Sequence, residues 1–261
     1  MKRIVLIIAF AAVSMVLTYA QGSAHTQNIE IKEEYTIITE GAVDLGLPSG
    51  TLWSALNLGA NTPYEAGDQY AWGDTNPYSQ ELFADDKYYV PWKYYKFYRI
   101  GGPDRGNRLT KYNTDEGLGF VDGKTSLELS DDMANIALGD GWRMPTKAEF
   151  EELADECVWV QYNVNGPRKD KVDIDFLSGY IVIGPNENAI FILATAEFTS
   201  PDYCTMYWSS ELTEHSTEAY ALYVDPYNNP RDSKWPDFPS YYVMRYERAD
   251  FCCIRPVKAK R

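Results

Sequence analysis

The chain has 261 residues, and its 38 acidic residues outnumber the 24 basic residues, giving a net charge of −14. A field of this sign repels phosphate backbones, so the composition argues against a nucleic-acid partner. The length suffices for one sizeable core, and no Pro-, Ser- or Gly-rich linker divides the interior. We therefore expect a single domain.

Residues 1–20 have the layout of a secretory signal peptide. Lys2 and Arg3 precede an apolar run over residues 4–17, and small or neutral residues follow. The alternative is a retained N-terminal membrane helix, but the run is shorter than the ~20 residues that a bilayer core requires. The sequence therefore predicts export, with no stable transmembrane span after processing.

Cleavage is expected after Ala20, and residues 22–24 offer a second site with small residues. No cysteine follows the apolar run, so we do not expect a lipoprotein. Processing would leave 22 basic and 38 acidic residues, a net charge of −16. The mature protein is predicted to be secreted, periplasmic or at the cell surface.

The first part of the mature chain is predicted to be a leader followed by short strands and loops. Residues 21–40 are polar and aperiodic up to the stretch EYTIITE, so we interpret them as a leader into one domain over residues 41–261. Gly and Pro punctuate short apolar pieces over residues 41–60, which indicates brief strands joined by tight turns. Residues 62–125 are predicted to form long ordered loops, because disordered segments are poor in aromatic residues.

Two helices are expected next. The sequence Ser130-Asp131-Asp132 can cap and charge the start of a short helix that ends before Gly139. In the stretch GDGWRMPTKAEFEEL (139–153), Thr146 and Glu149 have the spacing of a capping box. The second helix would carry one apolar stripe, at Phe150, Leu153, Ala154 and Cys157.

The corner before this helix is predicted to be buried. We expect Trp142 and Met144 to lie inside and Arg143 to contact a carboxylate or backbone carbonyls. One core cluster is expected to contain the residues of the corner, the helix and a strand that covers it, namely Trp142, Phe150, Leu153 and Trp208.

Beyond Trp159 the apolar pattern changes to that of strands. They are expected at 171–175, 179–184, 188–195, 205–210, 219–225, 241–246 and 252–257. A hairpin turn is expected at Pro185-Asn186-Glu187. Short antiparallel strands with two helices packed at one side indicate an α+β domain.

Seven segments run in order over residues 43–257: VDLGLPSGTLWSALNLGA (43–60), GDQYAWGD (67–74), LTKYN (109–113), VDGKTSLELSDD (121–132), GDGWRMPTKAEFEEL (139–153), YWSS (207–210) and IRPV (254–257). Together they resemble the Fibrobacter succinogenes major paralogous domain family, which is abundant in exported proteins of Bacteroides-like bacteria. The resemblance implies a divergent C-type-lectin-like fold, with two main helices, a twisted antiparallel sheet and long ordered loops that carry any ligand site. It implies no settled activity.

The chain also departs from its apparent relatives. Residues 190–198 read IFILATAEF where relatives read something like IFLPAAGYR, so a site built on the missing Gly and Arg is not expected. The calcium and sugar signatures of true C-type lectins are missing as well, and residues 184–186 and 235–237 only superficially resemble them. No metal or other cofactor is predicted. Oxygen ligands at Asp68, Asp74, Asp85 and Asp86 would suit Ca²⁺, but their spacing is not that of an EF-hand loop. Acidic turn residues usually face solvent or cap backbone N–H groups.

Two segments are candidates for ligand binding. Residues 225–240, DPYNNPRDSKWPDFPS, combine polar and aromatic side chains with prolines that limit the entropy lost on binding. Residues 87–100 hold seven aromatic residues, which either form a platform for sugars or attach a long loop to the domain. The predicted ligand-binding residues are Tyr227, Asn229, Arg231, Trp235 and Trp92.

Residues suited to catalysis are few. His215 lies in a turn and is expected to face solvent, and the nearby serines lack a nucleophile-elbow motif. Cys157, Cys204, Cys252 and Cys253 are either four thiols or include one disulfide, and strain disfavours a bridge between the adjacent pair. On a strand Cys252 and Cys253 point to opposite faces, so at most one is expected to face the core.

The sequence therefore favours an exported, non-catalytic binding or adhesion module that recognises a glycan or a protein at or outside the cell surface. One alternative is a thiol- or metal-dependent enzyme related to formylglycine-generating-type domains, with Cys252 or Cys253 as the reactive group. A structural component of a surface assembly is another alternative.

Overall fold

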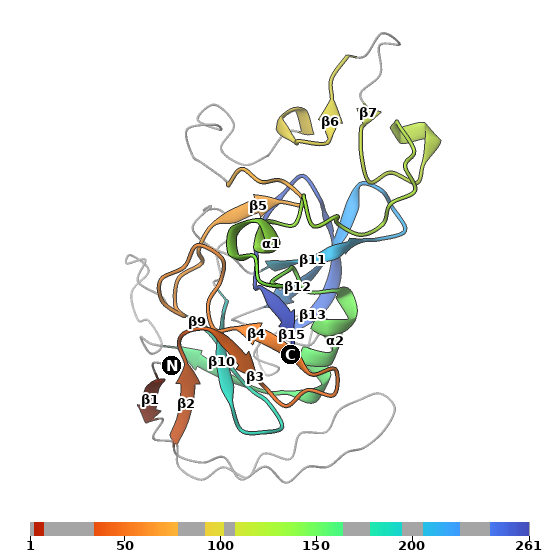
Figure 1. Ribbon diagram of the computed structural model, residues 1–261. Helices are drawn as coiled ribbons and strands as arrows, with labels where there is room; N and C mark the ends of the chain where they lie inside the picture. Colours follow the sequence, from red (N-terminus) through yellow and green to blue (C-terminus); the bar gives the residue numbers. More distant parts are fainter. Residues whose placement is uncertain are drawn as a thin grey trace, which may run out of the picture.

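The computed structural model describes residues 3–7, 34–77, 92–101, 108–163, 178–194, 206–224 and 241–260. In these residues the fold is mixed α+β, mostly strands with two α-helices and several sheets (Figure 1). The α-helices are α1 (Met133–Leu138) and α2 (Lys147–Glu156), and short 3-10 turns are η2 (Trp92–Tyr94) and η3 (Glu116–Leu118).

The strands fall into four sheets. One has the order β1 (Arg3–Ile7), β2 (Glu34–Ile38), β10 (Ala189–Leu193), β9 (Ser178–Ile183) and β8 (Val158–Asn163). The second, here the central sheet, has the order β13 (Tyr241–Glu247), β12 (Glu218–Val224), β11 (Met206–Leu212), β14 (Phe251–Cys253) and β5 (Gln69–Ala71). The smaller ones are β15 (Val257–Ala259), β4 (Thr51–Ser54), β3 (Ala42–Asp44), and the ribbon of β6 (Tyr98–Arg99) with β7 (Arg108–Leu109).

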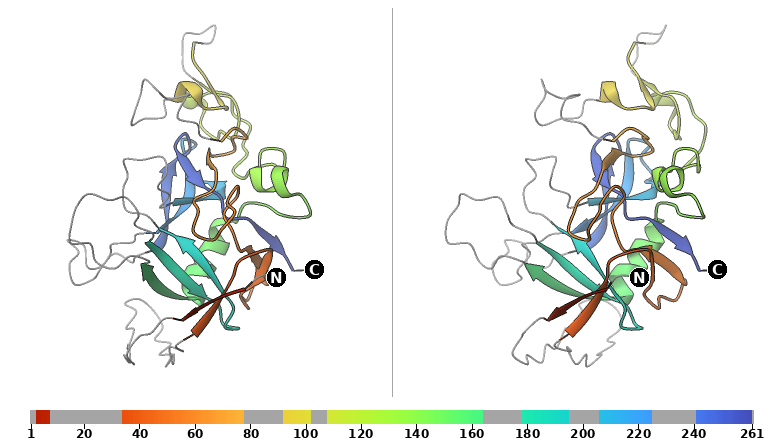
Figure 2. Two further views of the ribbon diagram at one scale, coloured as in Figure 1. Left: turned by 90° about the vertical axis from the view of Figure 1, so that its left-hand side faces the viewer. Right: turned by 60° about the vertical axis from the view of Figure 1, so that its left-hand side comes forward.

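The first five-stranded sheet lies on one side of the central sheet, and the β6–β7 ribbon lies on the opposite side (Figure 2). Most neighbouring strands are antiparallel, while β2 with β10 and β11 with β14 are parallel. Helix α2 packs against β11, β12 and β13. The expectation of an α+β domain is confirmed, with several sheets in place of the single one expected.

The strands predicted at 179–184, 188–195, 205–210, 219–225 and 241–246 are confirmed, with small shifts at their ends. The one predicted at 252–257 is instead two short strands, β14 and β15, in different sheets. Strands β9 and β10 form the expected hairpin, closed by hydrogen bonds from Glu187 N to Gly184 O and from Gly184 N to Asn188 O, both 2.9 Å. The predicted strand at 171–175 lies outside the described residues. Strand β8 was not expected, because it follows α2 after a single residue and has no turn signal before it.

Residues near the N-terminus also enter a sheet. Strand β2 lies in the segment interpreted as a leader, yet Ile37 and Ile38 are buried. Strand β1 falls inside the predicted signal peptide and pairs with β2. None of the helices in the described ranges combines the length and apolar character that a membrane crossing requires.

Arg143 lies at the corner before α2 and forms an ion pair with the first turn of that helix. Arg143 donates to both carboxylate oxygens of Glu149, at 2.7 and 2.6 Å, and to Met144 O at 3.0 Å. Glu149 also closes the capping box with Thr146 and accepts from Thr51 Oγ1 at 2.7 Å. Burial opposes ionisation of Glu149, but these hydrogen bonds hold the pKa of its carboxyl below the ordinary value. The predicted helix start and carboxylate partner are confirmed.

The prediction of one core cluster is wrong, because its side chains are divided between two separate clusters and Trp142 belongs to neither. Phe150 and Leu153 pack with Trp53, whose ring centre lies 5.6 Å from that of Phe150. Trp208 belongs to a second cluster with Trp72, since successive side chains of a strand point to opposite faces and Tyr207 is the one that faces α2's cluster. Trp142 is only partly buried, under Lys258.

The same alternation corrects the expectation for the adjacent cysteines. Cys252 and Cys253 are both fully buried, because Cys253 lies in the cluster of Phe150 and Cys252 in the cluster of Trp208. Strand β14 therefore has core on both faces.

Truncating Phe150 tests the packing of α2. Phe150 is fully buried, so Phe150→Ala should destabilise the fold by ~3–5 kcal/mol through lost burial and a cavity. Phe120 is 66% exposed, so the control Phe120→Ala should stay within about 0.5 kcal/mol of the parent. Denaturant unfolding of both variants measures the difference, and equal losses would contradict this packing.

Candidate functional site

The loop predicted to bind ligand, with Tyr227, Asn229, Arg231 and Trp235, lies outside the described residues. Trp92, the remaining predicted contact, is partly buried in η2. Its ring meets the edge of Tyr95 at 5.5 Å and also contacts Tyr98 at 5.3 Å. Trp92 therefore belongs to an aromatic group that attaches its segment to the domain.

Two further rings of that segment reach the core. Tyr95 and Phe97 are buried, and Tyr95 Oη donates to Trp72 O at 2.6 Å. Tyr94 is 53% exposed. The attachment expected for residues 87–100 is thus confirmed at Tyr95 and Phe97, while one side chain beside them stays available to solvent.

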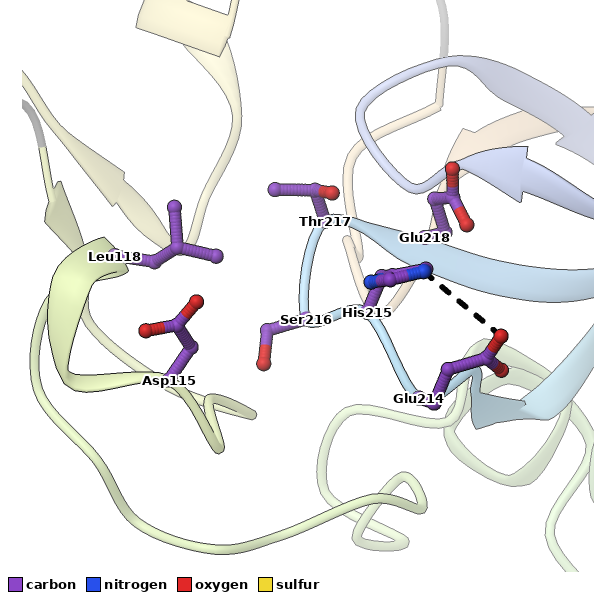
Figure 3. A pocket seen from close by; sticks show the side chains of 7 residues that line it. All are labelled: Asp115, Leu118, Glu214, His215, Ser216, Thr217 and Glu218. Atoms are coloured by element: carbon purple, nitrogen blue, oxygen red, sulfur yellow. Dashed lines mark ion pairs between the residues drawn. The ribbon is translucent and has the colours of Figure 1, made fainter.

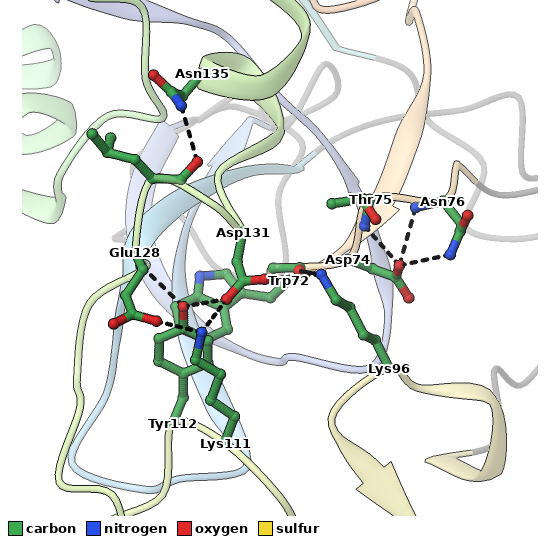
Figure 4. Close-up of polar contacts among 12 residues, drawn as sticks. Trp72, Asp74, Thr75, Asn76, Lys96, Lys111, Tyr112, Glu128, Asp131 and Asn135 are labelled. Carbon is green, nitrogen blue, oxygen red and sulfur yellow. Dashed lines mark hydrogen bonds and ion pairs between the residues drawn. The ribbon is translucent and has the colours of Figure 1, made fainter.

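A polar network around Asp131 fixes the same segment from its other side (Figure 4). Asp131 accepts from Lys96 Nζ at 2.9 Å, from Tyr112 Oη at 2.7 Å and from Lys111 Nζ. Burial opposes its ionisation, but the hydrogen bonds from Lys111, Tyr112 and Lys96 hold the pKa of Asp131 below the ordinary value. Asp131 is thus an anchor for this segment.

Arg248 holds the backbone of two residues of this network, Tyr112 and Lys111. It is fully buried and donates to the backbone carbonyls of Tyr112 at 2.6 Å and Lys111 at 2.9 Å. Its guanidinium also lies over the rings of Trp72 and Tyr95, 5.7 and 5.2 Å from their centres. Burial lowers the pKa of Arg248, although these rings and carbonyls accommodate the cation.

A polar hollow of about 370 Å³ lies between two turns, one carrying η3 and one joining β11 to β12 (Figure 3). Three carboxylates, an imidazole, two hydroxyls and one apolar side chain line it: Asp115, Glu214, Glu218, His215, Ser216, Thr217 and Leu118. We call this the turn hollow. It joins segments that are about a hundred residues apart in the chain.

Local hydrogen bonds shape both turns. Asp115 caps η3, with Oδ1 accepting from Gly117 N at 2.7 Å. In the other turn, Thr213 Oγ1 accepts from His215 N at 3.0 Å. Thr114 N donates to Ser216 Oγ at 2.9 Å, which joins the two turns. The hollow is therefore a built feature of paired turns.

The charges of the hollow are predominantly negative. Glu214 accepts from Arg245 at 2.7 Å, and its own backbone N–H together with Arg245 lowers the pKa of its carboxyl. His215 Nε2 lies 3.8 Å from Glu214 Oε1, and the histidine side chain is 61% exposed, as expected from sequence. Glu218 Oε2 is buried and accepts no hydrogen bond from the described part of the chain. A ligand that donates hydrogen bonds would complement the exposed carboxylates of Asp115 and Glu214, whereas Glu218 Oε2 is closed to solvent.

Sequence reasoning considered His215 but missed Asp115 and Glu218. Turn residues of this kind are common, and neither segment carries a spacing that would connect it to the other. The only local signal is the cap at Asp115, which predicts a turn and not a site.

The described thiols considered for catalysis are buried. Cys157, Cys252 and Cys253 are buried thiols without a disulfide, and Cys204 lies outside the described residues. Burial raises the pKa of Cys157 to about 12. Each is therefore poorly placed to act as a nucleophile.

The acidic residues considered for Ca²⁺ have other contacts. Asp74 Oδ1 accepts from Thr75 N and Asn76 N, while Asp68 accepts from Tyr70 Oη. Asp85 and Asp86 lie outside the described residues. In the ranges that the structure describes, three or more His, Cys, Asp or Glu side chains nowhere gather to hold a metal ion.

No protein family, curated protein or solved structure matches the chain. The resemblance to the Fibrobacter succinogenes major paralogous domain family therefore stays a prediction.

Removing the Asp131 charge should loosen the attached segment. We expect Asp131→Asn to cost about 1–3 kcal/mol in the free energy of unfolding at neutral pH and to speed amide exchange at Tyr95 and Lys111. Because the pKa of Asp131 is lowered in the folded protein, this difference should shrink as the pH falls below about 4. Asp140→Asn is the control, since its side chain is 57% exposed. Equal exchange rates in both variants would contradict the anchor.

Because the described thiols are buried, we expect them to react slowly with thiol reagents in the folded protein. In a Cys204→Ser variant, a thiol-specific reagent should leave the other three cysteines unmodified in native buffer and label them after denaturation. Mass spectrometry of the labelled protein gives the count. Rapid labelling of Cys252 or Cys253 in the native state would contradict this expectation and would support the alternative of a thiol-dependent enzyme.

Proposed function

We propose that the protein is an exported, non-catalytic binding or adhesion module that recognises a glycan or a protein through surface loops. The observation that carries the proposal is the turn hollow, whose polar side chains are presented by two turns joined at Thr114 and Ser216. Rigid turns lose little entropy when a ligand binds, which favours recognition. The burial of the three described thiols favours binding over thiol chemistry.

The lining of the hollow suits a ligand rich in hydroxyl groups. Carboxylates accept charge-assisted hydrogen bonds from hydroxyls, and Asp115, Glu214 and Glu218 contribute three carboxylates to its lining. Leu118 adds an apolar surface of the kind that packs against the C–H face of a sugar. A glycan uses both kinds of contact, so we place it ahead of a protein ligand.

The proposal includes the fold and location that the sequence indicates. We propose a divergent C-type-lectin-like arrangement, which the long loops and the two helices beside antiparallel strands support. We also propose that the signal peptide directs the protein to the periplasm, the cell surface or the medium.

A glycan array, followed by titration of its strongest glycan, tests the hollow. The double variant Asp115→Asn/Glu218→Gln should weaken binding by about tenfold or more, because it removes two hydrogen-bonding charges. Glu151→Gln/Glu156→Gln removes the same charge from the exposed side of α2 and should bind as the parent does. The side-chain shape is retained in both variants, so their folding can be compared directly.

Loss of binding in Trp235→Ala alone would move the site to residues 225–240. Full-strength binding by the Asp115→Asn/Glu218→Gln variant would contradict the assignment of the binding site to the turn hollow. A mature protein that retains no array glycan and captures no protein in a pull-down would contradict the binding function itself.

A further inference from the structure

The outermost strand of the first five-stranded sheet lies in the segment that export would remove. In the described part of the chain, β1 has the sequence RIVLI, ends the strand order of that sheet and has β2 as its neighbour (Figure 1). Strand β1 falls within residues 1–20, which we propose to be the signal peptide. Cleavage after Ala20 would therefore remove β1 and leave β2 as the last strand of the sheet.

The pairing that processing would remove runs along the whole of β2. The two strands are antiparallel over five residue pairs, from Arg3 opposite Ile38 to Ile7 opposite Glu34. On its other side β2 is parallel to β10, with Ile37 opposite Ala189. We call the side that β1 covers the β2 edge. Its backbone N–H and C=O groups need new partners once β1 is gone, because backbone polar groups are costly to leave unpaired.

Strand β2 has contacts that do not depend on β1. Ile37 is fully buried in the cluster that contains Phe191, and Ile38 is 4% exposed in the cluster that contains Val43. These two side chains therefore fix β2 between two cores. An edge whose position is already fixed loses little conformational entropy when another strand pairs with it.

The sequence of β2 lacks the features that protect natural edge strands. Such strands are commonly blocked by lysine, proline or a bulge. The sequence EYTII contains no lysine, proline or glycine, and four of its five residues are β-branched or aromatic, which favours a strand. Its register with β1 is continuous over all five pairs. The β2 edge is therefore suited to strand addition, in which an extended segment joins a sheet through backbone hydrogen bonds.

The strand that covers the edge indicates what kind of segment fits there. Four of the five residues of β1 are aliphatic, and the fifth is Arg3. The processed chain would have 22 basic and 38 acidic residues, a net charge of −16. Two copies of such a chain repel each other, whereas an apolar segment with basic residues is attracted. These charges favour a segment of a partner protein over a second copy.

We propose that the β2 edge of the mature protein binds an extended apolar segment of a partner protein, antiparallel to β2 and in the register that β1 shows. The proposal rests on the proposed export, because processing is the step that removes β1. Backbone hydrogen bonds would supply the affinity, and the apolar side chains of the partner would supply the specificity. The surface is additional to the turn hollow, and it would join the protein to a larger assembly.

A chain that begins at Gln21, prepared directly, tests the edge whatever processing occurs in the cell. The probe is a fluorescent peptide of residues 1–8, MKRIVLII, and its binding is followed by anisotropy. We expect the peptide to bind this mature chain and to bind the full chain at least about tenfold more weakly, because β1 already covers the edge there.

The control is the same peptide with Ile4→Pro/Val5→Pro, which keeps its apolar character and its charge. Adjacent N–H groups of a strand point to opposite sides, so one of the two lost donors faces β2. We expect this peptide to bind at least about tenfold more weakly than the parent peptide. Equal binding of the two peptides, or no binding of the parent peptide to the mature chain, would overturn the proposal.

Hydrogen exchange locates the bound peptide. The peptide should slow amide exchange in residues 34–38, whereas the amides of β10, an inner strand of the sheet, should exchange equally with and without it. Protection elsewhere, or amides at 34–38 that are already fully protected in the mature chain, would overturn the proposal. A dimer of the mature chain that the peptide dissociates would overturn the choice of a partner segment and would assign the edge to a second copy.

The glycan array, repeated with the peptide at saturation, separates this surface from the turn hollow. The Asp115→Asn/Glu218→Gln variant should bind the peptide as the parent protein does. Peptide binding without glycan binding would contradict the proposed glycan recognition alone, and glycan binding without peptide binding would overturn the strand addition alone. Mass spectrometry of the exported protein completes the test, because retention of residues 1–20 would overturn both the processing and the open edge.

Discussion

Burial of the central sheet on both faces is the constraint on which the rest of the structure depends. Tyr207 and Cys253 pack with Phe150 of α2 on one face, while Trp208 and Cys252 pack on the other. Core on both faces leaves five of the seven residues of β11 buried. The loops that present polar groups are attached to the second of these clusters, so their positions follow from it.

The corner at Arg143 connects that sheet to the rest of the fold. Its bidentate contact with Glu149 fixes the start of α2, and paired backbone hydrogen bonds with Val257 join the corner to β15. One charged pair therefore sets the direction of α2 and its contact with two sheets. Breaking either partner would leave a partly buried charge, which is why such pairs resist substitution more strongly than exposed ones.

The polar features that suggest function have a different organisation. The turn hollow gathers acidic groups, and a backbone hydrogen bond from Phe120 to Leu109 joins the segment that carries η3 to the β6–β7 ribbon. The segment that carries η2 is held by Asp131, which contacts both Lys96 and Lys111.

The sequence by itself determined local features: the capping box at Thr146, the short helix before Gly139, the hairpin at Pro185 and most strands from residue 179 onwards. These depend on neighbouring residues, whose hydrogen bonds and periodicity are visible in the chain. Only the tertiary structure decided that both Cys252 and Cys253 are buried, that Trp208 faces away from α2, and that Asp115 and Glu218 line the same hollow. Such pairings depend on which surfaces cover each sheet, and residues a hundred positions apart carry no local signal of that.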